Sequence, residues 1–197
     1  METLSSAMPP VSGGVAGTLA VQVIALVNSP ASVESAPLRD ILGAMLAAPV
    51  ARRVLAIEGP AADRLPSGFE LVAQRGGDFG DRLAGALADA YALAALPLLV
   101  VRADALDMTP DVLADAARSL LSGEADAAFG PASDGGFWLL GRRRPDRSRV
   151  AGIPGTAAGA PAAGAGRVLL DRLASAGLRV ALAPRLEIGG VLGAGTR

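Results

Sequence analysis

The stretch Leu19–Val27, which reads LAVQVIALV, decides the fold class of this 197-residue chain. Every residue in it except Gln22 is apolar, as is typical of a strand buried on both faces of a parallel sheet. Outward from it, short apolar runs alternate with stretches whose apolar residues recur at helical spacing. The further predicted strands are 53–57, 69–73, 97–101, 125–129, 137–140 and 179–183, and the predicted helices are 38–48, 78–94, 109–123 and 167–176. This alternation predicts an α/β fold of three layers, with a mixed, mainly parallel sheet.

The length of the chain fits one domain, which we expect to span residues 18–197. Residues 1–17 are rich in Ser, Pro and Gly and are predicted to be a disordered leader, and 147–166 is expected to be mobile for the same reason. The leader has no basic segment followed by an apolar one, so it does not resemble a signal peptide. The longest apolar stretch, 92–101, is too short to span a bilayer. We therefore expect a cytoplasmic protein with no membrane partner.

The composition excludes several kinds of chemistry. The chain has no Cys and no His, and its 18 basic residues are all Arg. Thiolate and imidazole catalysis, the Ser-His-Asp triad, Schiff-base chemistry and the P-loop lysine are therefore absent. The net charge of −1 argues against a nucleic-acid partner. An arginine cluster at 142–149 favours a solvated basic loop, although it could bind an acceptor phosphate or an acidic partner.

Ligands of doubly wound sheets bind at the carboxyl ends of the strands, so the segments that follow predicted strands are the candidates for a site. The first is 102–108. Asp104 follows a buried strand and precedes a helix start at Thr109-Pro110, and a carboxylate there could hold Mg²⁺ or Mn²⁺. The alternative is a solvated carboxylate, or one that caps backbone N–H groups.

The second candidate is the segment 130–141, which contains Asp134-Gly135-Gly136. Glycines beside a carboxylate let the backbone approach a ligand closely. The same three residues also make an ordinary hairpin turn. Trp138, the single Trp, could belong to the core or form the floor of a pocket.

The third candidate is the segment 74–83, with glycines just before a predicted helix. Backbone N–H groups at a helix N-terminus suit an anion. The alternative is a plain strand-to-helix turn with Asp78 as the N-cap.

Together the three segments resemble a family of bacterial transferases, the arsenosugar-biosynthesis-associated glycosyltransferases. These share the GT-A-like, nucleotide-diphospho-sugar transferase fold with molybdenum-cofactor and phospholactate nucleotidyltransferases. The family pattern runs Gln-x-x-Gly-Asp-Leu-Gly-x-Arg, then Gly-Ser-Asp-x-Pro-x-Leu-Thr, then Gly-Pro-x-x-Asp-Gly-Gly-Tyr-x-Leu-Gly. Here these motifs fall at 74–82, 102–109 and 130–141, and the similarity is greatest over 70–145.

The resemblance implies a metal-dependent transferase with a nucleotide or nucleotide-sugar donor and a small-molecule acceptor, and it leaves open whether the chain forms a homodimer. Asp104 would bind Mg²⁺ or Mn²⁺, with Glu187 as a second or surrogate ligand. Asp134 would contact the acceptor or act as a base. The residues implied in substrate binding are Gln74, Gly77, Arg82, Gly135 and Gly136.

The chain departs from the family at three places, one of which is the loss of the Ser and Pro that flank the central Asp, Asp104. The family's first loop is basic, whereas Asn28–Pro37 has no cation and contains Glu34. The family's late Asp-x-Asp-Thr falls at Glu187-Ile188-Gly189-Gly190, where one carboxylate remains. Each charge-assisted phosphate contact is worth ~1.5–3 kcal/mol, so a weakened donor site is expected. The alternative function is a catalytically degenerate member that acts as a binding or regulatory subunit.

Overall fold

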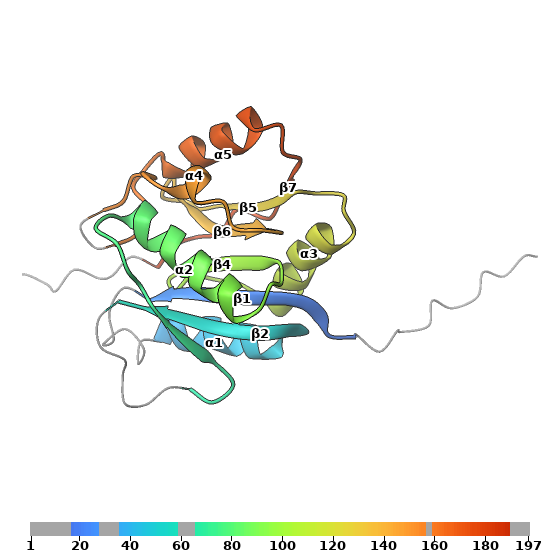
Figure 1. The fold of residues 1–197 in the computed structure, drawn as a ribbon. Helices are drawn as coiled ribbons and strands as arrows, with labels where there is room; N and C mark the ends of the chain where they lie inside the picture. The colour runs from blue at the N-terminus through green and yellow to red at the C-terminus, as the bar shows by residue number, and fades with distance from the viewer. Residues whose placement is uncertain (1–16, 28–35, 59–65, 157–158, 190–197) are drawn as a thin grey trace, which may run out of the picture.

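The computed structural model describes residues 17–27, 36–58, 66–156 and 159–189. They form one seven-stranded sheet with helices on both faces (Figure 1). The strands are β1 (Leu19–Val27), β2 (Val50–Ile57), β3 (Glu70–Ala73), β4 (Leu98–Arg102), β5 (Ala127–Pro131), β6 (Phe137–Arg142) and β7 (Val180–Leu182). The helices are α1 (Ala36–Ala47), α2 (Phe79–Leu93), α3 (Pro110–Leu121), α4 (Arg147–Val150) and α5 (Ala165–Ser175).

The strand order places β1 and β4 near the middle of the sheet. The order is β3-β2-β1-β4-β6-β5-β7, and β1 is parallel to both of its neighbours, β2 and β4. Among the strands described, only β6 runs against its neighbours, being antiparallel to β4 and β5. The prediction of a mixed, mainly parallel sheet is therefore confirmed, and the carboxyl ends of β1 to β4 meet at one edge.

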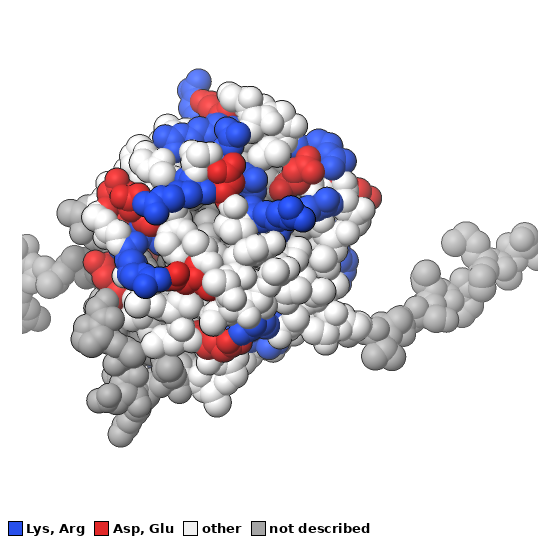
Figure 2. Space-filling model, in the orientation of Figure 1, with Lys and Arg blue, Asp and Glu red and all other residues white. Residues whose placement is uncertain are grey.

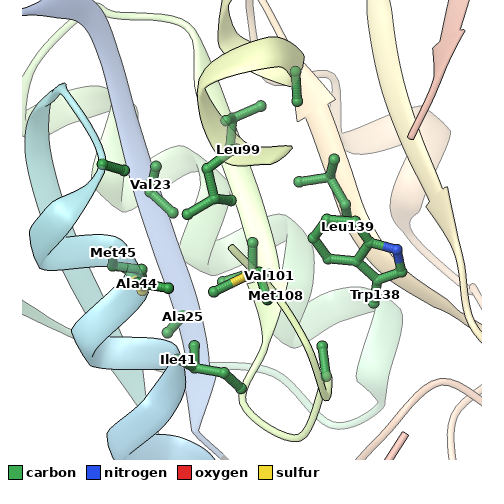
Figure 3. Packing of buried hydrophobic residues seen from close by; sticks show 14 of the residues in the cluster. Val23, Ala25, Ile41, Ala44, Met45, Leu99, Val101, Met108, Trp138 and Leu139 are labelled. Carbon is green, nitrogen blue, oxygen red and sulfur yellow. The ribbon is translucent and has the colours of Figure 1, made fainter. Parts of the chain in front are cut away.

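Strand β1 is buried on both faces, as its unbroken apolar run predicts. Its side chains at 21, 23, 25 and 27 belong to the buried cluster on the side of α1 and α3, whereas Ile24 and Leu26 belong to the cluster on the side of α2 and α5. Figure 3 shows the first of these layers, where Val23 and Ala25 of β1 face Ile41 and Met45 of α1. This alternation follows from the period of two along a strand.

The buried polar residue of β1 has its own partner. The Gln22 amide donates to the carbonyl of Ala94 at 2.8 Å. The carbonyl belongs to the residue that ends α2, so this bond ties the central strand to the C-terminus of that helix. The N–H side of this buried amide is thus satisfied, whereas its Oε1 is buried without a hydrogen bond.

Two helices begin where the sequence predicts. Asp78 caps α2 by accepting from the backbone N–H of Asp81 at 2.7 Å. Thr109 caps α3 through its hydroxyl, with Pro110 in the first turn. Both caps satisfy a backbone donor that the helix itself leaves free. At 74–83 Asp78 is therefore the N-cap of a strand-to-helix turn, as one of the two alternatives predicted; anion binding at this turn stays a prediction.

The segment 147–166 is expected from the sequence to be mobile because it would bury too little apolar surface, and burial within its described residues, 147–156 and 159–166, contradicts that reason. Val150, Ile153 and Ala165 are 3%, 1% and 0% exposed. Short helix α4 and the start of α5 bury these side chains against α2 and the sheet. Small residues here allow close contact between backbones, an effect that composition alone does not distinguish from disorder. The predicted leader lies outside the described residues, apart from Gly17.

None of the helices in the described ranges has the length and apolar character needed to cross a bilayer.

Candidate active site

The first and second candidate segments meet at one guanidinium group. Arg102, the last residue of β4, donates from Nε and NH2 to the two oxygens of Asp104, at 2.9 and 2.8 Å. Its NH1 donates to Oδ2 of Asp134 at 2.7 Å. The structure thus brings Asp104 and Asp134 together: Asp104 follows the end of β4, and Asp134 lies in the turn before β6, the antiparallel neighbour of β4.

Arg102 is almost fully buried, with 6% of its surface exposed. Burial alone would lower its pKa, but the hydrogen bonds and charges of Asp104 and Asp134 outweigh that effect and raise the pKa above the usual value. The arginine is therefore permanently charged. Because two carboxylates face one guanidinium, the cluster carries one net negative charge.

A third segment, Leu186–Gly189, runs between the other two. The backbone N–H of Leu106 donates to the carbonyl of Glu187, and that of Gly189 donates to the carbonyl of Asp104, both at 2.8 Å. The hydroxyl of Ser133 accepts from the backbone N–H of Ile188 at 3.2 Å. The Glu187 position predicted from the late motif therefore lies beside the cluster, with its side chain exposed.

As arranged here, these residues do not fit a divalent cation. Both oxygens of Asp104 and Oδ2 of Asp134 accept hydrogen bonds from Arg102, and Oδ1 of Asp134 accepts from the backbone N–H of Gly136 at 2.9 Å. Within the described part of the chain, no three acidic side chains are grouped so that they could hold a metal. The pairing of Asp104 with Glu187 around Mg²⁺ or Mn²⁺ thus stays a prediction that no contact supports.

The two glycines after Asp134 are explained by packing. Gly135 has a positive φ of 82°, and its carbonyl accepts from the backbone N–H groups of Gly164 and Gly166 at the start of α5. A Cβ at Gly136 would lie 3.1 Å from Pro161 and 3.3 Å from NH1 of Arg102. Glycine here makes room for a neighbouring segment and for the buried arginine. A role for either glycine in substrate binding stays a prediction.

The third candidate segment lies at the carboxyl ends of β1 to β3. The Gln74 amide donates to the carbonyls of Val27 and Ala56, at 3.0 and 2.7 Å. Gln74 thus joins the ends of β1 and β2, and a role for it in substrate binding stays a prediction.

Arg82, on the first turn of α2, has a donor to spare. Its Nε is buried, makes no hydrogen bond, and lies 3.9 Å from Oε2 of Glu58. NH1 makes a long contact of 3.5 Å with the carbonyl of Gly77. A Cβ at Gly77 would meet nothing within 4 Å, so the space beside this glycine is open. Arg82 is therefore a cationic side chain with a donor that no hydrogen bond satisfies, which makes it a candidate contact for an anionic group.

Sequence reasoning missed the role of Arg102. The local signal was weak: only two positions separate Arg102 from Asp104, and the chain turns between them, with the N–H of Ala105 donating to the carbonyl of Arg102 at 3.5 Å. The contact with Asp134 had no local signal, since 32 positions separate the two residues. Trp138 belongs to the core, where its Nε1 donates to the carbonyl of Pro184 at 2.9 Å (Figure 3).

The surface offers little other guidance to a site. A pocket of about 230 Å³ lies between α3 and residues 181–184, and none of the predicted site residues lines it. On the face drawn in Figure 2, blue Arg and red Asp or Glu side chains are interspersed.

The arginines at 147 and 149 of the predicted basic loop pair with Asp81 and Asp146, respectively. The first loop, 28–37, lies outside the described residues except for Ala36 and Pro37, which begin α1.

Comparison with known proteins gives a family and a fold. The profile of a family described as "Uncharacterized protein conserved in bacteria (DUF2064)" matches residues 41–155, more than half of the chain. No curated protein matches. Nothing in these comparisons bears out the more specific resemblance to arsenosugar-associated enzymes.

Three solved structures illustrate the fold. A candidate nucleotide-diphospho-sugar transferase from Desulfovibrio desulfuricans G20 is 21% identical, with a TM-score of 0.69 over 86% of this chain and 81% of that one. A Pyrobaculum calidifontis mannosyltransferase, in complex with GDP-Man and Mn²⁺, is 20% identical, with a TM-score of 0.56 over 89% and 58%. The glucosyl-3-phosphoglycerate synthase of Mycobacterium tuberculosis, in complex with Mn²⁺ and UDP, is 16% identical, with a TM-score of 0.56 over 93% and 77%. At these identities the likeness shows a GT-A fold.

Proposed function

Because the chain belongs to the DUF2064 family and has a GT-A fold, we propose that it binds a nucleotide-activated donor and transfers the glycosyl or nucleotidyl group to a small-molecule acceptor. The observation that carries the proposal is the meeting of three chain segments, 102–106, 133–136 and 186–189, at the carboxyl end of β4. In folds of this kind, ligands bind at that edge. Fold alone would not suffice, because function depends on the site.

In this proposal the donor phosphates lie near Arg82, at the ends of β1 to β3. The Arg82 side chain, whose buried Nε makes no hydrogen bond and lies 3.9 Å from Glu58, would turn to give a phosphate oxygen a charge-assisted hydrogen bond, which is stronger than one between neutral groups. Gln74 and Gly77 flank the same space. The donor would therefore lie along the carboxyl edge, with its reacting group towards β4.

The acceptor would contact Asp134, whose carboxylate is 37% exposed. As a base, this carboxylate would take the proton of an acceptor hydroxyl. In glycosyl transfer the hydroxyl oxygen would bond to the anomeric carbon as the bond from that carbon to the nucleotide phosphate breaks and the nucleotide leaves. In nucleotidyl transfer the oxygen would bond to the α-phosphorus as the bond to the β-phosphate breaks and pyrophosphate leaves. Asp134 is held by Arg102 and by the Gly136 N–H, so its position is defined before the acceptor binds. Both oxygens of Asp104 accept hydrogen bonds from Arg102, so the expected metal does not fit there and has no part in the proposed reaction.

A second function is favoured by one observation. The cluster of Arg102, Asp104 and Asp134 is closed by its own hydrogen bonds and carries a net negative charge, which repels phosphate. A protein with such a cluster could bind a nucleotide through Arg82 without turning it over. It would then act as the binding or regulatory subunit that the sequence departures suggest.

Ligand binding tests the proposal. Thermal shift with UDP-, GDP-, ADP- and CMP-linked sugars should find a stabilising donor, with ~2.7 kcal/mol of stabilisation at 100 times its dissociation constant. Arg82→Ala should weaken that donor about tenfold, or ~1.4 kcal/mol. Arg75→Ala is the matched control, because Arg75 is exposed and paired with Asp89 and should not change affinity.

Turnover separates the two functions. Release of nucleotide from the bound donor in the presence of candidate acceptors supports the transferase. Binding without release supports the regulatory subunit. If no nucleotide or nucleotide sugar stabilises the protein, both functions are contradicted.

A further inference from the structure

We propose that the Arg102 guanidinium is a fixed cation that takes the place of a divalent metal between Asp104 and Asp134. On this view the wild-type protein does not bind a divalent cation at this position, and removal of the arginine side chain creates a site for one. The inference goes beyond the proposed function, because it concerns only ions and holds whether or not the chain transfers a group.

The geometry is the first support. Three N–H donors of one guanidinium reach three carboxylate oxygens at 2.7 to 2.9 Å. A magnesium ion would need those same oxygens at about 2.0–2.1 Å in octahedral geometry. Both cations cannot lie between the two carboxylates, because their charges repel and their positions overlap.

The second support is that Arg102 is buried and always carries its positive charge. Arg102 is 6% exposed, and the pairing with Asp104 and Asp134 raises its pKa above an already high value. It cannot lose its proton to make way for a metal. Moving the guanidinium away from both carboxylates would break three charge-assisted hydrogen bonds of a buried arginine, which is costly.

The chemistry of the freed site is the third support. Without Arg102, both oxygens of Asp104 and Oδ2 of Asp134 would lose their donor, and the local charge would be −2. One or two carboxylates with water are a common way to hold Mg²⁺ in proteins. Ser133 and Gly136 would still position the turn, because their bonds do not involve Arg102.

Titration with Mn²⁺ alone, followed by electron paramagnetic resonance of the free ion, tests the inference. Arg102→Ala should bind Mn²⁺ at least tenfold more tightly than the wild type, and Mn²⁺ should raise its Tm without raising that of the wild type. Arg179→Ala is the matched control. Arg179 donates from Nε and NH2 to the two oxygens of Asp126, as Arg102 does to Asp104, but it has no second carboxylate partner among the described residues. This control should gain no Mn²⁺ binding.

A double variant locates the gain. In Arg102→Ala/Asp104→Asn the added Mn²⁺ affinity should disappear. If Arg102→Ala folds poorly, Arg102→Gln keeps more of the side-chain volume and should give the same gain. The inference is overturned if the wild type binds Mn²⁺ as tightly as these variants, or if the gain persists in the double variant. Since no nucleotide is used, a failure to find a donor would leave this result unaffected.

Discussion

Arg102 is the residue that most changes the interpretation of the site. Asp104 alone resembles a metal ligand at the end of a strand, and Asp134 alone resembles part of a hairpin turn. With Arg102 between them, each carboxylate is already neutralised in part. An arginine at the end of an otherwise apolar strand can remain buried only with such partners, because an isolated buried charge is very costly.

A second ion pair, between Arg179 and Asp126, changes the pKa of the Asp126 carboxyl. Arg179 donates from its side chain and its backbone N–H to Asp126, and these bonds lower the pKa of Asp126 to about 2 from 3.8. A lowered pKa in the folded state stabilises the protein above the unfolded value, and this contribution is lost as the pH falls from about 4 to about 2.

NMR titration of the Asp126 carboxyl should give a midpoint near 2 in the wild type. In Arg179→Ala the midpoint should rise towards the ordinary value, and the stability difference between the two proteins should shrink below pH 4. A wild-type midpoint at the ordinary value would contradict the pairing.

At the scale of elements, the contact between α2 and the segment after α4 matters most. A Cβ at Gly80 would lie 2.6 Å from backbone atoms of Val150, Gly152 and Ile153. The first turn of α2 and this loop are therefore in direct backbone contact. The contact explains how an Ala/Gly-rich stretch can be packed: its small residues allow close approach, in a way that larger side chains would not.

Gly80→Ala should destabilise the protein by about 1–3 kcal/mol, because the loop must move to admit the methyl group. Gly43→Ala is the control, since a Cβ there meets nothing within 4 Å, and it should stabilise α1 by about 0.5–1 kcal/mol. Urea unfolding followed by Trp138 fluorescence measures both. Limited trypsin digestion at Arg147 and Arg149 should also be faster in Gly80→Ala. Equal stability of the two variants would contradict the packing.

At the scale of the whole molecule, stability should fall from the middle of the sheet to its edges. Strands β1 and β4 are paired on both sides and covered on both faces. Edge strand β7 has three residues, and its Leu182 is 71% exposed. Opening free energies in proteins range from near zero at exposed elements to the global value in the core.

Amide hydrogen exchange should therefore be slowest in β1 and β4 and much faster in β3 and β7. The amide of Gly135, at the β5–β6 turn, reports on the site and should exchange at an intermediate rate, since it donates to Ala132. The predicted fall in stability from the middle of the sheet to its edges would be contradicted if β7 exchanged as slowly as β1.

The sequence by itself determined the fold class, most element positions and two helix caps. Apolar runs, helical spacing and caps such as Asp78 and Thr109 are local features, and each depends on residues a few positions apart. Only the tertiary structure decided that Arg102 joins Asp104 to Asp134, and that 147–156 and 159–166 pack. These contacts link segments far apart in the chain. Their energy comes from burial and charge pairing, which no local pattern records, so they exist only once the sheet brings the segments together.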